Sequence, residues 1–272
     1  MNFYSQLEAI LTTDTIERKE SLLAEALKYC NTEEMAPEAG FVPRSFESPS
    51  YARRCRIVAP RDLPRRRKFA TREGLALQVH AIAHIEYSAV DLAVDAVYRF
   101  PQMPREYKRD WLEVAQEEIR HFKMLERILE MLGHRYGDFP VHRGLFDAAK
   151  HTQRDVLERM AVIPRHYEAT GLDVNPRIVE KLAPLKRKPE IAALLEALEV
   201  IYEEEIDHVR KGDRWFRYVC RERGLDPEST FLEILTRYRL LGGRSALNVE
   251  ARREAGFACS ELLSLGAEAC EE

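Results

Sequence analysis

Hydrophobic residues recur with a helical period along most of the chain. Long stretches place apolar side chains three or four positions apart, and no run alternates residue by residue as a half-buried strand does. Glycine and proline are few and fall mainly between these stretches. The pattern therefore predicts an all-α fold. Its longest periodic segments predict four long helices, at about 71–99, 105–132, 145–170 and 189–221.

Shorter helical patterns flank these four segments. One or two short helices are expected between Phe3 and Cys30, and the pattern beyond residue 225 again predicts helix. Pro164 should kink the third long helix, and only a short helical stretch is expected in the link at 171–188. The predicted organisation is an N-terminal helical segment with an extended arm, a four-helix bundle, and a C-terminal helical extension, at residues 1–70, 71–222 and 223–272.

A glutamate interrupts the apolar stripe of the first long helix. Glu86 occupies a core position, because its neighbours three and four residues away are all apolar: Ile82, Ala83, Ala89 and Val90. An unpaired buried carboxylate is costly, so such a group must be protonated, paired or bound to a cation. On the third helix Glu168 follows a less regular apolar pattern in a comparable place.

The pentapeptide Glu-Glu-Ile-x-His occurs twice, at 117–121 and 204–208. In each copy the second glutamate and the histidine share one helix face, and that face continues an apolar stripe. A bundle with an inward Glu from each of two helices and a Glu-x-x-His from each of the others has the ligands of a dinuclear iron or manganese site. The candidate ligands are Glu86, Glu118, His121, Glu168, Glu205 and His208. A metal-free polar network of the same groups is the alternative.

Residues beside these ligands are expected to play supporting roles. Glu117 and Glu204 lie about 100° round their helices, which places them at the rim of the site. Tyr202 is either a hydrogen-bond or radical partner of the site or a core tyrosine satisfied by one hydrogen bond.

The first and third long helices also share a spacing of polar residues. His84-x-Glu86 with Asp91 has the spacing of His166-x-Glu168 with Asp173, which predicts a pseudo-twofold arrangement of two helix pairs. His84 and His166 point about 200° away from the neighbouring glutamates. They are therefore not expected to be ligands.

Composition excludes several classes of protein. The net charge of −4 gives no overall attraction to nucleic acid or anionic membranes. No apolar run approaches the roughly 20 residues of a membrane span, and the N-terminus lacks the features of a signal peptide, so a cytoplasmic protein without membrane contact is expected. The five cysteines form no Cys-x-x-Cys pair, which favours reduced structural thiols.

Residues 53–68 form a strongly basic arm with a single acid, Asp62. Clustered Arg and Lys can bind the phosphates along a nucleic-acid backbone. The candidate RNA-binding residues are Arg65, Arg66, Arg67 and Lys68. A solvated strap lying over an acidic bundle is the other interpretation, because charge runs alone are weak evidence.

Several stretches resemble a known family: 80–86 (HAIAHIE), 96–100 (AVYRF), 136–140 (YGDFP), 165–173 (RHYEATGLD) and 214–218 (RWFRY). Between about residues 50 and 258 the chain is similar to the ferritin-like superfamily, and within it to a rubrerythrin-related bacterial family of unknown function. A more distant similarity is to the di-iron tRNA hydroxylases. The resemblance implies a ferritin-like four-helix bundle with a carboxylate-bridged di-iron site. Unlike the familiar rubrerythrin, this chain has no Cys-x-x-Cys electron-transfer module.

These features lead to three functional hypotheses. The first is an O2-dependent di-iron oxidoreductase, a hydroxylase or oxidase of undetermined substrate, with two iron ions, or manganese or a mixed pair, and an external electron donor. The second is a rubrerythrin-like peroxide reductase that also depends on an external donor. The third is a non-catalytic helical module that binds RNA or protein through the basic arm. A homodimer is compatible with each.

Overall fold

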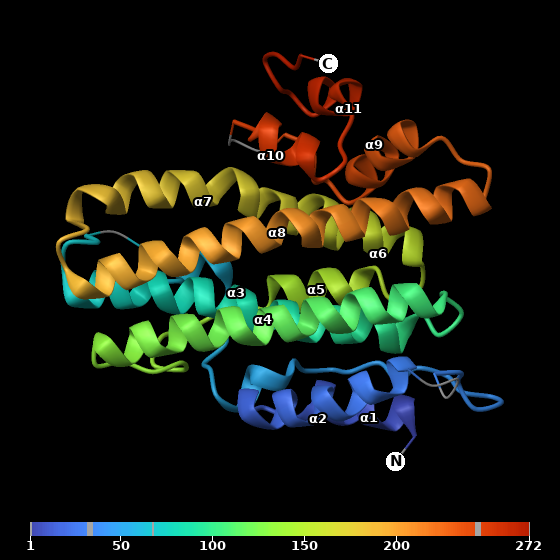
Figure 1. The fold of residues 1–272 in the computed structure, drawn as a ribbon, viewed down its shortest axis with the longest axis horizontal. Coiled ribbons are helices and arrows are strands. Elements are labelled where there is room, and N and C mark those ends of the chain that lie inside the picture. Colours follow the sequence, from blue (N-terminus) through green and yellow to red (C-terminus); the bar gives the residue numbers. More distant parts are fainter. Residues whose placement is uncertain (1, 32–34, 67, 243–245, 272) are drawn as a thin grey trace. The chain divides into compact units, whose positions relative to one another are not determined.

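The computed structural model describes residues 2–31, 35–66, 68–242 and 246–271. The regular elements of these residues are all helices (Figure 1), with one isolated parallel bridge between Ile57 and Val141. The all-α prediction is confirmed. The chain forms two compact units, Met1–Lys150 with Lys188–Ala197, and His151–Arg187 with Leu198–Glu272.

The first unit is built on two long helices that pack along each other, α3 and α4. Its helices are α1 (Phe3–Thr12), α2 (Ile16–Lys28), α3 (Arg72–Arg99), α4 (Arg105–Met131) and α5 (Gly144–His151). The N-terminal helix α1 packs on α3, and α2 packs on α4 (Figure 1). Because α3 is covered on more than one side, most of its residues are buried. The predicted bounds of both long helices hold to within one residue at each end.

The second unit contains a π-helical turn between two α-helices. Its elements are α6 (Val156–Val162), the π-helix η4 (Ile163–Glu168), α7 (Ala169–Leu182), η5 (Ala183–Leu185), most of α8 (Pro189–Glu222), α9 (Pro227–Arg237), α10 (Val249–Glu254) and α11 (Cys259–Ser264). The π-helix contacts α6 and α7, α9 packs on α6, and α10 packs on α7. The helical patterns expected at both ends of the chain are therefore present as α1, α2 and α9 to α11.

The third long helix does not run unbroken from 145 to 170 as predicted. It divides into α5 and α6 at Thr152–Asp155. The Asp155 side chain accepts a hydrogen bond from the Leu157 backbone N–H at 2.9 Å, so it caps a new helix start. Its carboxylate also pairs with Arg223 at 2.8 Å. This capped restart is the physical reason for the break.

The two prolines of this region behave differently from each other. Pro164 produces the π-helical turn where a kink was predicted. Pro176 does not end the helix. Helix α7 continues through it to Leu182, so the link contains more than the short helical stretch that was predicted. Proline lacks the N–H that would bond the carbonyl of Leu172, and the Asn248 side-chain amide donates to that carbonyl instead, at 3.2 Å. A residue distant in sequence thus supplies the hydrogen bond that the proline cannot form.

One pair of cysteines departs from the expectation of free thiols. Cys259 and Cys270 form a disulfide, whereas Cys30, Cys55 and Cys220 are free. The bridge joins the start of α11 to the end of the chain across 11 residues. The prediction of reduced thiols throughout is therefore wrong for this pair, because neither cysteine has the close sequence spacing that marks a local motif.

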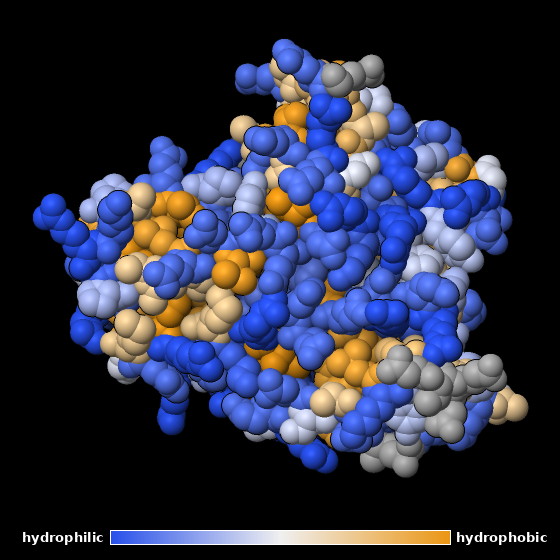
Figure 2. Space-filling model, viewed as in Figure 1, coloured by the Kyte–Doolittle hydropathy of each residue, from blue (hydrophilic) through white to orange (hydrophobic). Residues whose placement is uncertain are grey.

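No helix among the described residues combines the length and the apolar content needed to cross a bilayer. On the face shown in Figure 2, polar and charged side chains predominate, and apolar ones lie between them in small separate groups. Exposed large apolar residues are accordingly few, and one of them, Ile85, lies on α3 with 47 % of its surface accessible.

Candidate metal centre

Three potential metal ligands meet in the first unit. Helix α3 presents Glu86, and α4 presents Glu118 and His121. The His121 Nδ1 lies 3.2 Å from Glu86 Oε2 and 3.4 Å from Glu118 Oε2. Each residue offers one donor atom within 4.8 Å of the others'. We refer to Glu86, Glu118 and His121 as the first set.

The first set lies in the core, and its electrostatics favour a cation. Glu118 and His121 are completely buried, and Glu86 is 4 % exposed. Burial alone lowers the pKa of His121, but hydrogen bonds and charges from Glu118 and Glu86 outweigh it and raise the pKa to about 11. The two carboxylates thus stabilise positive charge between them. This buried cluster of carboxylate oxygens and imidazole nitrogen could bind a metal ion.

The buried lysines of the unit are engaged with other groups. Lys19 binds the Asp91 carboxylate at 2.6 Å and the Ile10 carbonyl at 2.7 Å. Lys108 donates to the carbonyl of Met35 at 3.0 Å. Neither ammonium group is therefore committed to the carboxylates of the first set.

The second unit carries the matching residues Glu168, Glu205 and His208, which we call the second set. Glu205 and His208 share a face of α8, with His208 Nδ1 3.8 Å from Glu205 Oε1. His208 is completely buried, and the Glu205 side chain is 14 % exposed. Glu168 is half-buried and is the last residue of the π-helix.

Close packing holds the π-helix of Glu168 against α8. A Cβ atom placed on Gly212 would lie 2.2 Å from Pro164 Cβ, so only glycine permits this approach. Gly212 lies one turn beyond His208 on the same helix face. The contact therefore links the segment that carries Glu168 to the one that carries His208.

A buried arginine fixes the same π-turn. The Arg165 side chain has no exposed surface and forms ion pairs with Asp213 at 2.9 Å and Glu261 at 2.7 Å. Three aromatic rings surround its guanidinium with centroids 4.2–4.7 Å away: Phe216, Phe231 and Phe257. Arg165 is not among the residues that the pattern identifies. Its position directly after an apolar run, Ala161 to Pro164, is the signal that could have revealed it.

The aspartates that have matching positions in the two units, Asp91 and Asp173, also have matching roles in the structure. Asp91, five residues after Glu86, binds the buried Lys19 of α2. Asp173, five residues after Glu168, binds the buried Arg252 of α10 through two hydrogen bonds of 2.9 and 2.7 Å. Each aspartate thus anchors a terminal extension through a buried cation. The signal for Lys19 is its place on the apolar face of its helix.

His84 forms its hydrogen bonds with groups other than the candidate ligands. His84 Nε2 lies 2.9 Å from the His142 carbonyl, so this nitrogen donates and Nδ1 accepts from the Tyr136 hydroxyl at 2.9 Å. Burial lowers the pKa of His84 and His166 to about 4. Both are therefore neutral at physiological pH.

The expected neighbours of the site lie at varied depths. Glu117 is half-buried and lines a surface groove with the charged residues Arg120 and Lys123. Glu204 is half-buried as well. The Tyr202 hydroxyl accepts a hydrogen bond from Asn248 Nδ2 at 2.8 Å. Roles for these residues beside a metal stay predictions.

The basic arm is exposed over the part that the structure describes. Arg65, Arg66 and Lys68 are exposed, and Arg67 lies outside the described residues. Arg61 lies 3.9 Å from Asp62, but Arg65, Arg66 and Lys68 form no ion pair with a described residue. These three side chains therefore do not hold the arm against acidic groups of the bundle by ion pairs. Binding of nucleic acid stays a prediction.

Gly212→Ala is expected to destabilise the protein by roughly 1–3 kcal/mol, because the added methyl group overlaps the Pro164 ring. Gly171→Ala is the matched control, since this exposed helical glycine has nothing within 4 Å of the added Cβ and should gain about 0.5–1 kcal/mol. Urea unfolding of both variants measures the difference. Equal stability of the two would show that the contact with Pro164 is not tight.

Comparison with known proteins identifies relatives without a described activity. Residues 12–263 match the profile of a family described as "Protein of unknown function (DUF455)". An "Uncharacterized protein" of Haemophilus influenzae is 42% identical over 213 residues, which is 76% of this chain and 72% of the relative. No solved structure matches the chain.

Proposed function

The chain belongs to this family, and we propose that it is a carboxylate-bridged dinuclear metal protein of ferritin-like fold that acts as an O2-dependent oxidoreductase. The observation that carries the proposal is the first set, in which Glu86, Glu118 and His121 converge in a buried position. The second set, from α8 and the π-helix, completes the proposed centre.

Charge and symmetry support a single centre with two metal ions. Each set supplies two carboxylates and one imidazole, so two divalent cations balance the four negative charges. The matched aspartates Asp91 and Asp173 extend the correspondence beyond the ligands. Two equivalent halves that each hold one Glu-x-x-His pair correspond to the ligand pattern of the di-iron carboxylate bundles. Manganese or a mixed pair uses the same donors.

Two bound Fe(II) ions would supply the electrons that begin the reduction of O2. The residues of the two sets would hold these ions, and the burial of Glu118 and His121 would exclude bulk water from them. The chain has no Cys-x-x-Cys pair of the kind that binds an electron-transfer iron, so further electrons would come from a separate donor. The substrate is a small molecule or an RNA.

Protein isolated from iron-replete cells is expected to contain about two metal ions per chain, as the paired ligand sets require. Elemental analysis against a quantitative amino-acid analysis measures this. A metal content well below one ion per chain would contradict the proposal.

Rapid mixing of the anaerobically reduced, iron-loaded protein with either O2 or H2O2 distinguishes the two enzyme hypotheses. An oxidoreductase that uses O2 should be oxidised by O2 at least as fast as by an equal concentration of H2O2. Absorbance changes of the iron report the rate. Rapid oxidation by H2O2 with a sluggish response to O2 would instead establish a peroxide reductase.

A further inference from the structure

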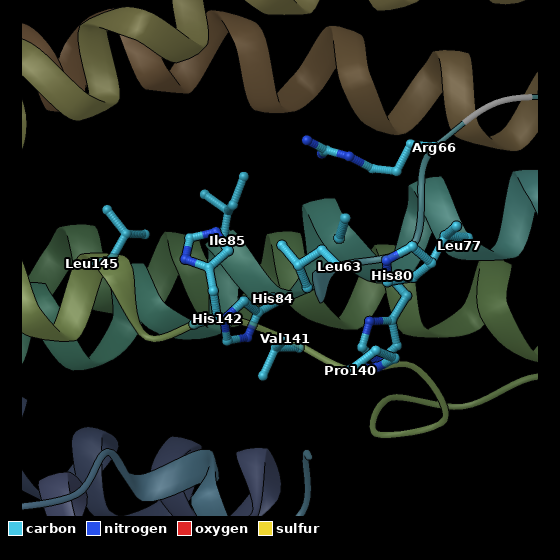
Figure 3. Close-up of a pocket in the computed structure, with 12 residues that line it drawn as sticks. Leu63, Arg66, Leu77, His80, His84, Ile85, Pro140, Val141, His142 and Leu145 are labelled. Atoms are coloured by element: carbon cyan, nitrogen blue, oxygen red, sulfur yellow. The ribbon is translucent and has the colours of Figure 1, made fainter. Parts of the chain in front are cut away.

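A pocket of about 100 Å³ lies in the first unit (Figure 3), and none of the candidate metal ligands lines it. Its walls are one face of α3, the basic arm at residues 63–66 and the segment at residues 140–145. Since one water-sized position takes roughly 10–15 Å³, the pocket has room for about seven to ten non-hydrogen atoms. It is therefore large enough for a small organic ligand.

The pocket uses the face of α3 opposite to the first set. Leu77, Ala81 and Ile85 line it, and the centre of this face is about 180° round the helix from Glu86. Ile85 keeps 47 % of its surface accessible on a helix that is otherwise mostly buried. An accessible apolar wall in a concave site is typical of a ligand pocket. The walls contributed by the other segments are also largely apolar, including Leu63 and Val141.

The histidines that line the pocket are neutral. His80 accepts a hydrogen bond from the Gly137 N–H at 2.9 Å, and both ring nitrogens of His84 are engaged. Burial and the positive charge of Arg66 hold the pKa of His142 below its ordinary value. Since His142 Nδ1 accepts from the Gly144 N–H at 3.0 Å, the proton of its neutral ring lies on Nε2, which can donate.

Arg66 supplies the charge of the pocket. It is the lining residue with a permanent charge, and its exposed guanidinium forms no ion pair with a described residue. The acid that acts on the charge of His142 is Asp147, which is itself paired with Arg143 at 2.8 Å. The pocket thus combines apolar walls with one uncompensated cation at its border (Figure 3).

We propose that this pocket binds a small organic anion, a short-chain or aromatic carboxylate whose apolar body contacts Leu77, Ala81 and Ile85 while its carboxylate binds Arg66. A guanidinium offers paired donors in the geometry that a carboxylate accepts. A fully polar ion such as inorganic phosphate should bind more weakly, because the apolar walls would remove its hydration and Arg66 and His142 Nε2 would replace only part of it. The site does not depend on the metal centre or on the proposed reaction.

Isothermal titration calorimetry of the protein as isolated with benzoate tests the proposal, with benzamide and inorganic phosphate as comparison ligands. Benzoate is expected to bind in the millimolar range or tighter, and its neutral isostere benzamide roughly tenfold more weakly, since it forms no ion pair. Inorganic phosphate should bind more weakly than benzoate. Phosphate binding as tight as that of benzoate would show an anion site on the arm rather than this pocket.

Two variants localise the ligand. Arg66→Gln should weaken benzoate binding by roughly tenfold, whereas Arg65→Gln, which changes an adjacent exposed arginine outside the pocket lining, should leave it unchanged. Ala81→Leu should abolish binding by filling the pocket, with circular dichroism to verify the fold. Absence of benzoate binding to the native protein, or equal losses in both arginine variants, would overturn the proposal.

Discussion

Replacement of Glu118 and His121 together by alanine is expected to remove both metal ions from the protein, not one of them. If the two sets form one dinuclear centre, as proposed, each ion would depend on ligands from both sets, so loss of one set would leave the other with incomplete coordination. Glu205→Ala with His208→Ala should have the same effect. Metal per chain, measured by elemental analysis after gel filtration, is expected to fall by at least roughly tenfold in each double variant.

The number of metal ions that each double variant retains distinguishes one shared centre from two independent sites. If the first and second sets bind metal independently, each double variant should lose one ion and retain the other. Glu113→Ala is the control, because this residue of α4 lines a surface groove and pairs with Arg109, and it should keep its full metal content. Full loading of either double variant would contradict metal binding by these residues.

Arg165→Leu is expected to destabilise the protein by about 3–5 kcal/mol, because it leaves Asp213 and Glu261 buried without one of their cations. It also removes the cation that three aromatic rings surround. The midpoint of thermal unfolding should fall by on the order of 10 °C, as scanning calorimetry can measure. Arg217, which contacts the same acids at 2.9 and 2.6 Å, retains part of the charge balance.

Two further variants separate the effect of burial from that of charge. Arg210→Leu removes an exposed arginine that pairs with Asp207 and Glu254, and its cost should stay within about 1 kcal/mol. Adding Glu261→Leu to Arg165→Leu should recover part of the loss, since one unpaired buried charge disappears. A cost for Arg165→Leu as small as that for Arg210→Leu would show that the network does not hold the π-turn.

The long helices of the first unit could be predicted because their signals are local. Thr71 caps α3, accepting a hydrogen bond from the Gly74 N–H at 3.1 Å, and Pro104 immediately precedes α4. The third helix was predicted less well. Helix α7 also continues through Pro176, where Asn248, more than 70 residues away, donates to the carbonyl that the proline leaves without an N–H partner. No pattern around Pro176 contains that information.

The candidate ligands could likewise be identified from their places on apolar stripes, and the structure buries Glu86, Glu118 and His121 together. The groups that hold the surrounding segments could not. Lys19 and Arg252 come from the terminal extensions and meet Asp91 and Asp173 only after folding. Cys259 and Cys270 are paired by the path of the chain after α11.

The sequence by itself determined that the chain is helical, where its longest helices in the first unit lie, and which faces carry Glu86, Glu118 and His121. Helical periodicity is a property of neighbouring residues, so these conclusions need no knowledge of distant contacts. Only the tertiary structure decided that Arg165 is a buried cation surrounded by three aromatic rings and that Pro164 packs directly against Gly212. It also decided that a pocket bordered by Arg66 lies on the face of α3 opposite to Glu86. These features arise where segments far apart in sequence pack together, because the energy of a buried charge or a close contact depends on all the groups around it.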